Sequence, residues 1–558
     1  MPENGRLLVA MLVLAAAAVV ALGGFPAGVV ADGDAAAPDV GAGPNATLVE
    51  AFPSPVPRGD PGEFVAVRFD GPTDTTNWTL TDGHATAQLP NRTMSGTVAF
   101  SPEPGVARNY TDHRVEPVEG RLLLADDGDR LELRADGRAV STARYRRAPD
   151  SKIRDFEAAA WRPLGATDHR PVSTHIDEAT AFVLPDSPDL VEASLSGTEN
   201  RLWLAGYTFG SDSIADTLVA AANRGVDVRL LLDGAPVGGM TDRQARLLDR
   251  LTAAGVDVRL LAGDHSRYRH HHPKYALADD RSLVTTENFK PAGTGGMSSR
   301  GWGVRLDDEA TADELAAVFE SDWSWRAATP WQEYRAGRSF VDGDPALGGF
   351  EKRHAPETVS VNSATVLTAP DNADDELVSM LDAAEERILI QQVRIDSREN
   401  RLLRAAVRAA DRGVPVRIHL ADSWYVEDDN AALAEWLTDR AATDDLPLDV
   451  RIDDPAGYDK IHTKGVVVDD TAVVGSLNWV RTAKAENREV LVALRGEPAA
   501  DYYAAVFDDD WHGDDGASSR SVPAGILGAV AVGIAVALLV VRQFEFVGRN
   551  GTLTDWQW

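Results

Sequence analysis

An internal duplication limits what this chain of 558 residues can fold into. Two segments occur a second time, each 188 residues later: "ANRGVDVRLLLDG" (222–234) as "ADRGVPVRIHLAD" (410–422), and "AAVFESDW" (316–323) as "AAVFDDDW" (504–511). A repeat of this kind indicates that one structural unit occurs twice. We place the two copies at residues 179–326 and 364–512.

Each copy has the order strand, helix, strand. An apolar run such as "RLWLAGYTF" or "RILIQQVRI" precedes an Ala-rich helical segment, and a second apolar run follows it. This order predicts an α/β fold with βαβ units, in which helices cover a largely parallel sheet. A segment with Pro and Gly, residues 327–363, is predicted to link the two copies.

The copies also share a polar motif. "HPKYALADDRSLVTTENF" (272–289) aligns without gaps to "HTKGVVVDDTAVVGSLNW" (462–479). Both contain His-x-Lys, an Asp and an Asn at the same spacing: His272, Lys274, Asp279 and Asn288 in the first copy, and His462, Lys464, Asp469 and Asn478 in the second. Only seven lysines stand beside 48 arginines in the chain, so two lysines at one equivalent position indicate a specific need.

The chemistry of His-x-Lys favours an anion. Side chains two residues apart on a strand lie on the same face, and a lysine beside a histidine repels a metal ion. Two such strands could hold a phosphodiester between them, with Asn288, Asn478 and Ser476 as neutral donors. One imidazole can attack phosphorus while the other protonates the leaving oxygen. A metal site at the run His270, His271 and His272 is the alternative.

The motif resembles the signature of the phospholipase D superfamily, HxK-x4-D followed by GS-x-N. The second copy matches it throughout, with Gly475 and Ser476 before Leu477 and Asn478. The first copy has Thr286 in place of the serine, and a threonine hydroxyl can replace it. The resemblance implies a metal-independent phosphohistidine mechanism without a cofactor.

The resemblance also implies roles for single residues. His272 becomes the nucleophile and His462 the general acid and base, while the carboxylates of Asp279 and Asp469 stabilise the fold. The family uses a downstream acid to orient the histidine. Glu489 supplies it 27 residues after His462, whereas the first copy has glycine near the equivalent place, so His272 is expected to be oriented differently. Lys274, Lys464, Thr286 and Ser476 complete the predicted site.

The N-terminal part follows another pattern. Residues 47–147 consist of short alternating runs separated by Gly, Asp and Pro, which predicts an all-β sandwich. Their order resembles the lamin tail domain, an immunoglobulin-like sandwich, and the resemblance implies a binding or positioning module. Residues 148–178 are predicted to be a linker to the first copy.

Apolar segments at both ends of the chain predict export and anchoring in a membrane. Residues 1–31 read as a secretory signal peptide, with an uncleaved anchor as the alternative. The uncharged segment 522–541 is long enough to cross a bilayer, and Arg542 follows it. We therefore expect a single-pass protein of the cell membrane with its catalytic part outside and residues 542–558 in the cytoplasm. Four glycosylation sequons, at Asn45, Asn77, Asn91 and Asn109, fit an external location.

The charge balance is strongly acidic. Asp and Glu total 87 against 55 Lys and Arg, a net charge of −32, which is typical of halophilic proteins. In molar salt the screening length falls to about 3 Å, so this charge does not exclude a polyanionic substrate. The absence of cysteine excludes disulfides and thiol catalysis.

These features together predict a surface phosphodiesterase that hydrolyses a phospholipid headgroup. An extracellular nuclease that uses the same two histidines on DNA is one alternative, and a non-catalytic surface binding protein is another. Because both motifs lie in one chain, we expect a monomer.

Overall fold

The structure is a computed structural model, and it describes residues 46–513 except 56–60, 150–151, 263–265, 344–345, 347 and 454–456. The predicted signal peptide, membrane segment and cytoplasmic tail lie outside the described residues. Within the described part, no helix has both the length and the apolar character needed to span a bilayer.

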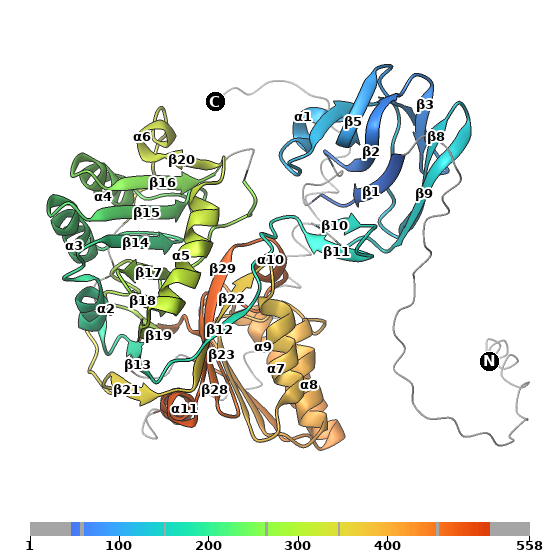
Figure 1. Cartoon of the computed structure of the whole chain (residues 1–558). Helices are drawn as coiled ribbons and strands as arrows, with labels where there is room; N and C mark the ends of the chain where they lie inside the picture. The colour runs from blue at the N-terminus through green and yellow to red at the C-terminus, as the bar shows by residue number, and fades with distance from the viewer. Residues whose placement is uncertain are drawn as a thin grey trace, which may run out of the picture.

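The N-terminal region is rich in β-structure, as predicted, and contains two sheets with a common core (Figure 1). The first sheet has the order β11 (Ala160–Pro163), β10 (Lys152–Asp155), β1 (Ala46–Phe52), β2 (Phe64–Asp74), β5 (Thr93–Ser101), β6 (Arg114–Pro117). The second has the order β7 (Glu119–Gly120), β4 (Thr86–Gln88), β3 (Trp78–Thr81), β8 (Gly128–Ala135), β9 (Arg138–Arg146). A short helix, α1 (Pro104–Ala107), follows β5.

Each copy of the repeat is built on one sheet. The sheet of the first copy has the order β20 (Ala328–Pro330), β16 (Asp257–Leu261), β15 (Asp227–Asp233), β14 (Arg201–Gly206), β17 (Tyr275–Ala278), β18 (Arg281–Thr285), β19 (Ser299–Asp307), β13 (Glu178–Leu184), β21 (Glu357–Ser360), and β26 (Lys460–Ile461) also pairs with β19. The sheet of the second copy has the order β12 (Val172–Thr174), β22 (Ser363–Ala369), β29 (Glu489–Arg495), β28 (Thr471–Gly475), β27 (Lys464–Val468), β23 (Ile388–Gln392), β24 (Val416–Leu420), β25 (Leu448–Ile452).

The two predicted linkers contain regular structure. Residues 148–178 include β10 and β11, which extend the N-terminal sheet, and β12, which pairs with β22 of the second copy. Residues 327–363 include β20, β21 and the helix α6 (Trp331–Tyr334). Apart from the pairing of β10 with β11, these strands pair with partners far away in the sequence, so the local pattern of each short segment did not reveal them.

The prediction of a largely parallel sheet was wrong. In the sheets of the two copies, β14–β15–β16 and β23–β24–β25 run parallel, as βαβ units require, and the short β26 pairs parallel with β19. The motif strands β17, β18 and β19 run antiparallel, as do β27, β28 and β29. The reason is the two-residue turn between β17 and β18, because a parallel pair needs a long crossover.

Helices form layers on both faces of each sheet (Figure 1). The first copy contributes α2 (Pro188–Leu195), α3 (Asp212–Asn223), α4 (Asp242–Ala253) and α5 (Glu309–Trp323). The second contributes α7 (Ala373–Ala383), α8 (Arg401–Asp411), α9 (Glu427–Asp444), α10 (Arg481–Ala485) and α11 (Glu497–His512). Side-chain caps at Ser211, Thr241, Asp308 and Asn400 begin four of these helices by accepting backbone N–H groups.

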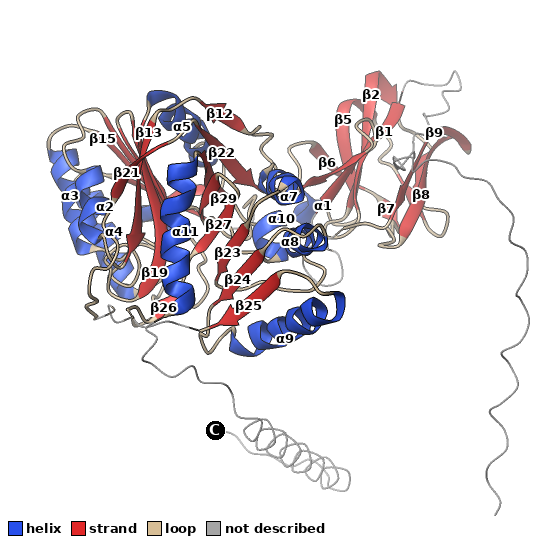
Figure 2. Ribbon diagram, turned by 90° about the horizontal axis from the view of Figure 1, so that it is seen from below, coloured by secondary structure: helices blue, strands red, loops and turns tan. Residues whose placement is uncertain are grey.

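The central core lies where the two copies meet. The helices α2 to α4 cover the outer face of the first sheet, and α7 and α8 cover that of the second, whereas α5 and α11 lie between the sheets (Figure 2). The core there joins both copies, and the stacked rings of Trp302 and Tyr503 lie 4.8 Å apart within it. The two copies therefore form one folded body.

Two buried arginines fasten this interface, one from each copy. Arg488 contacts Asp322 of the first copy at 2.9 Å and Asp371 of the second at 2.7 Å. Arg300 contacts Asp186 at 2.6 Å and Asp510 at 3.0 Å in the corresponding way. Because each guanidinium binds one carboxylate from either copy, the relative position of the copies depends on both networks.

Candidate active site

The two motif histidines lie at the interface between the copies, and each is held by the backbone of the other copy. The N–H of His272 donates to the carbonyl of Arg488 at 3.0 Å, and the N–H of His462 donates to that of Arg300 at 2.9 Å. The arginines that join the copies thus also position the histidines.

Glu489 contacts His272, which corrects the pairing expected from the sequence. A carboxylate oxygen of Glu489 lies 2.8 Å from Nδ1 of His272. The reason is the pairing across the interface, because the start of β29 runs beside residues 271 and 272. The acid that follows His462 in the sequence therefore orients the histidine of the other copy.

His462 has its own acid, Glu287, which the sequence reasoning missed. Its carboxylate oxygen lies 3.1 Å from Nδ1 of His462. Backbone bonds align Trp302 with Val490, so Gly301 is the counterpart of Glu489. A Cβ atom at Gly301 would lie 2.3 Å from Cγ of Glu287. The missing side chain at Gly301 thus leaves the space that Glu287 fills.

The second copy has Leu477 where the first has Glu287, and Glu489 where the first has Gly301. Exchanging the residues at positions 287 and 301 tests the role of Glu287. We expect Glu287→Leu to lower kcat/KM for phosphodiester cleavage by roughly 10²- to 10⁴-fold, because His462 loses its orienting acid. Adding Gly301→Glu should restore most of the activity. Steady-state kinetics checks both variants.

The same variants distinguish a role of Glu287 in positioning His462 from a role in folding. With a 4-nitrophenyl leaving group, which needs no proton, the loss in Glu287→Leu should become much smaller. An equal loss with both leaving groups, or no recovery in the double variant, would contradict the positioning role.

Both imidazoles are neutral in the free protein. Burial lowers the pKa of His272 to about 4, with Lys274 acting in the same direction and Glu489 against it. Burial likewise lowers the pKa of His462 to about 3, with Glu287 opposing the shift and Lys464 adding to it. Since each Nδ1 faces a carboxylate, each Nε2 is the nitrogen left for a substrate.

The motif lysines are buried beside the histidines. Nζ of Lys274 donates to the carbonyl of His272 at 2.6 Å, and Nζ of Lys464 donates to that of His462 at 2.5 Å. Burial lowers the pKa of Lys464 to about 7, against the attraction of Glu287 and Glu489. It also holds the pKa of Lys274 well below its usual value.

These shifts predict the alkaline side of the pH profile. Above pH 7 Lys464 loses its proton and its attraction for a phosphate, so kcat/KM should decline as the pH rises through that value. A bound phosphodiester raises the pKa of the lysine, so the decline of kcat should lie at higher pH. Lys464→Arg, which cannot deprotonate, should lack the decline near pH 7; a decline unchanged in this variant would contradict the assignment.

The motif aspartates serve the turns before the second motif strand of each copy. Asp279 has φ +56° and accepts N–H groups from Glu199 and Asn200 at 2.8 and 2.7 Å. Asp469 has φ +50° and does the same for Glu385 and Glu386 at 3.0 and 2.8 Å. A carboxylate that satisfies backbone donors at a left-handed turn fits a structural role.

The predicted substrate contacts divide into two groups. The hydroxyls of Thr286 and Ser476 accept the N–H groups of Trp302 and Val490 at 3.0 Å, and both residues are fully buried. In this structure they join strands and are fully buried, so their contact with a substrate stays a prediction. Asn288 and Asn478 each keep a buried side-chain oxygen without a hydrogen-bond partner among the described residues, and their predicted contact with a substrate stays a prediction.

The histidine run has separate roles at its three positions. Nε2 of His271 lies 3.6 Å from Asp322, and Nδ1 of His270 lies 3.7 Å from Asp233. No group of three or more metal-ligating side chains occurs among the residues that the structure describes. His272 faces Glu489 in the site, and Tyr207 lies against its ring with the ring centroids 4.8 Å apart. Tyr207 is a second contact that the sequence reasoning missed.

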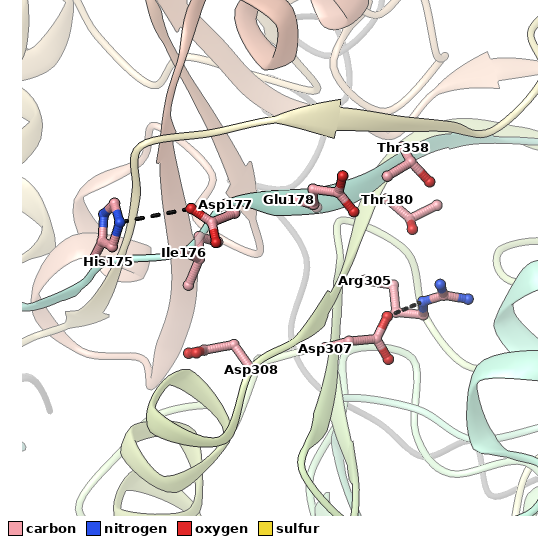
Figure 3. Close-up of a pocket in the computed structure, with 10 residues that line it drawn as sticks. His175, Ile176, Asp177, Glu178, Thr180, Arg305, Asp307, Asp308 and Thr358 are labelled. Atoms are coloured by element: carbon pink, nitrogen blue, oxygen red, sulfur yellow. Dashed lines mark hydrogen bonds and ion pairs between the residues drawn. The ribbon is translucent and has the colours of Figure 1, made fainter.

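A separate surface hollow of about 520 Å³, whose lining residues are drawn in Figure 3, does not include the motif histidines His272 and His462. His175, Asp177, Glu178, Arg305, Asp307 and Asp308 line it. His175 lies 3.7 Å from Asp177, and Arg305 contacts Asp307 at 3.0 Å. Its charges are thus partly paired within the hollow, and it contains no motif residue.

Comparison with known proteins bears on both copies. The model of the family described as "Cardiolipin synthase, PLD-like domain" matches residues 191–323 and 377–511. Cardiolipin synthase A of Klebsiella pneumoniae subsp. pneumoniae is 26% identical over 320 residues, which are 54% of this chain and 61% of that protein. The same enzyme of Escherichia fergusonii is 25% identical over 358 residues, 59% of this chain and 68% of that one. The chain thus spans less than two thirds of the first of these relatives.

Two solved structures are also similar. Phosphatidylserine synthase of Haemophilus influenzae Rd KW20 is 14% identical, with a TM-score of 0.45 over 60% of this chain and 86% of that chain. Nuc, a phospholipase D family member of Salmonella typhimurium, is 19% identical, with a TM-score of 0.24 over 29% of this chain and 98% of that chain. Both segments matched by the family model, which together cover just under half of the chain, contain a His-x-Lys motif, so these two regions are phospholipase D-like.

Proposed function

We propose that the protein cleaves the headgroup phosphodiester of a phospholipid and passes the phosphatidyl group to an alcohol or to water. The observation that carries this proposal is the pairing of each motif histidine with a buried glutamate of the other copy. Two neutral imidazoles and two buried lysines at one interface are suited to a phosphodiester anion.

The proposed reaction has two displacements. Nε2 of His272 attacks phosphorus and the bond to the leaving oxygen breaks, while His462 gives that oxygen a proton. The entering hydroxyl then gives its proton to His462, its oxygen bonds to phosphorus, and the bond to His272 breaks. A negative phosphodiester beside the rings favours the imidazolium form, so His462 gains its proton when the substrate binds.

Exposed apolar side chains beside the site support a lipid substrate. Val237 is 81% exposed, and its N–H donates at 2.6 Å to the hydroxyl of Tyr207, the residue that packs on His272. On the corresponding loop of the second copy, Trp424 is 88% and Tyr425 45% exposed. Tryptophan and tyrosine are favoured where an apolar phase meets water, so both loops suit a bilayer surface.

The names of the relatives agree with a lipid substrate. Cardiolipin synthases act in lipid synthesis by name, so transfer to an alcohol is proposed together with hydrolysis. A location outside the cell, with a C-terminal anchor, remains a proposal that rests on the sequence. The same holds for the lamin tail-like module, the halophilic source and the monomeric state.

The test uses the full chain in molar KCl with EDTA. Phospholipid labelled in the headgroup and labelled DNA are offered separately, with and without glycerol as an acceptor. We expect release of the headgroup, with part of the phosphatidyl group on glycerol. Cleavage of DNA alone would favour the nuclease, and cleavage of neither would favour the non-catalytic binding protein.

A further inference from the structure

Four of the seven lysines in the chain gather at the candidate site. Lys274 and Lys464 belong to the motifs, but Lys290 and Lys460 do not. Repulsion from both Lys290 and Lys460 contributes to the low pKa of Lys464, and repulsion from Lys460 contributes to that of Lys290. In a chain that otherwise uses arginine, this gathering indicates a second binding function beside the catalytic pair.

The backbone brings Lys290 and Lys460 together from opposite copies. Lys460 begins β26, which pairs with Ser299 at the start of β19. Lys290 begins the loop that leads into β19, and the N–H of Ser299 donates to the carbonyl of Ala292 in this loop at 3.1 Å. Lys460 precedes His462 by two residues, so both lysines stand on the His462 side of the site.

In the described part of the chain neither ammonium group is bonded to a carboxylate, although Glu287 attracts Lys290 at longer range. Among the described residues no hydrogen bond or ion pair joins Lys290 or Lys460 to an acidic side chain, although the chain has 87 acids. Glu287 and Glu489, the acids of the site, are engaged by the histidines. Two neighbouring cations that are not bonded to a carboxylate are stabilised by an anionic ligand.

Lys290 and Lys460 make the site asymmetric, because neither has a lysine as its counterpart in the opposite copy. At the offset of 190 residues, Lys290 corresponds to Val480 and Lys460 to His270. The His272 side therefore lacks the two lysines and has Tyr207 instead. In the proposed reaction, the leaving and entering alcohols exchange their protons with His462, so they lie on the side that carries the extra charge.

We propose that Lys290 and Lys460 form a second anion subsite, which binds a phosphate carried by the alcohol that enters or leaves at His462. This inference rests on the proposed function and adds the chemical class of the second substrate. The alcohol is either a free glycerol phosphate or the headgroup of a second phospholipid, because both present a hydroxyl near a phosphate.

The test compares acceptors in the full chain. Phosphatidyl transfer is measured to glycerol, to sn-glycerol 3-phosphate and to phosphatidylglycerol in vesicles. In Lys290→Gln/Lys460→Gln, transfer to the phosphate-bearing acceptor should fall at least 10-fold relative to transfer to glycerol. Lys290→Arg/Lys460→Arg should retain most of this preference, and Lys352→Gln, at a lysine on the surface, should leave it unchanged. The acceptor with the larger change identifies the source of the phosphate.

The outcomes separate this inference from the proposed function. An equal loss with all acceptors, or no change in preference, would overturn the subsite. Binding of sn-glycerol 3-phosphate, measured by calorimetry without any donor, should weaken at least 10-fold in the double glutamine variant. If this binding is observed but no phospholipid is cleaved, the subsite stands and the proposed function fails.

Discussion

Replacing His462 by alanine is expected to lower kcat for phospholipid cleavage by at least about 10³-fold, because the leaving oxygen loses its proton donor. With a 4-nitrophenyl leaving group the first displacement needs no acid, so the variant should still transfer the phosphatidyl group to His272. The second displacement needs a base, so the phosphoenzyme should accumulate after one turnover. Burst kinetics measures this accumulation directly.

His272→Ala provides the opposite result, since the group that attacks phosphorus is missing. It should show neither turnover nor a burst with either leaving group. His175→Ala, at an exposed histidine of the separate hollow, is the matched control and should behave as the wild type. A burst in His272→Ala and none in His462→Ala would reverse the two roles.

Replacing Arg488 by methionine is expected to lower the free energy of unfolding by about 3–5 kcal/mol, because the carboxylates of Asp322 and Asp371 remain buried without their partner. The loss should also lower activity, since the carbonyl of Arg488 holds His272. Guanidinium denaturation at constant salt measures the stability of each variant.

Two further variants identify the cause. Arg495→Met removes an arginine that is exposed and contacts Asp470 at 3.3 Å, and it should cost less than about 1 kcal/mol. Adding Asp322→Asn and Asp371→Asn to Arg488→Met should recover part of the loss, because the buried negative charges disappear. A loss that stays the same in this triple variant would show that buried charge is not its cause.

The internal repeat and its motifs could be read from the sequence alone. The duplication and both His-x-Lys motifs were visible without a structure, and they predicted two phospholipase D-like regions, which are confirmed. The β-rich N-terminal region was predicted from its alternating pattern. These features depend on residues close together in the sequence.

The contacts between the copies could not be predicted in this way. The family resemblance identified Glu489 as an orienting acid, but only the packing of the copies shows that it contacts His272. Glu287 was hidden because its counterpart is a leucine and the expected acid position holds Gly301. The rarity of lysine was noticed for the motif, and the same signal could have identified Lys290 and Lys460.

The measurement that tests the central claim most directly is the capture of the covalent intermediate. The full chain is mixed with phospholipid labelled with ³²P, quenched in alkali and digested, and the labelled peptide is sequenced by mass spectrometry. We predict the label on His272, with none in His272→Ala. Turnover of phospholipid without label on either His272 or His462 would contradict the two-histidine mechanism.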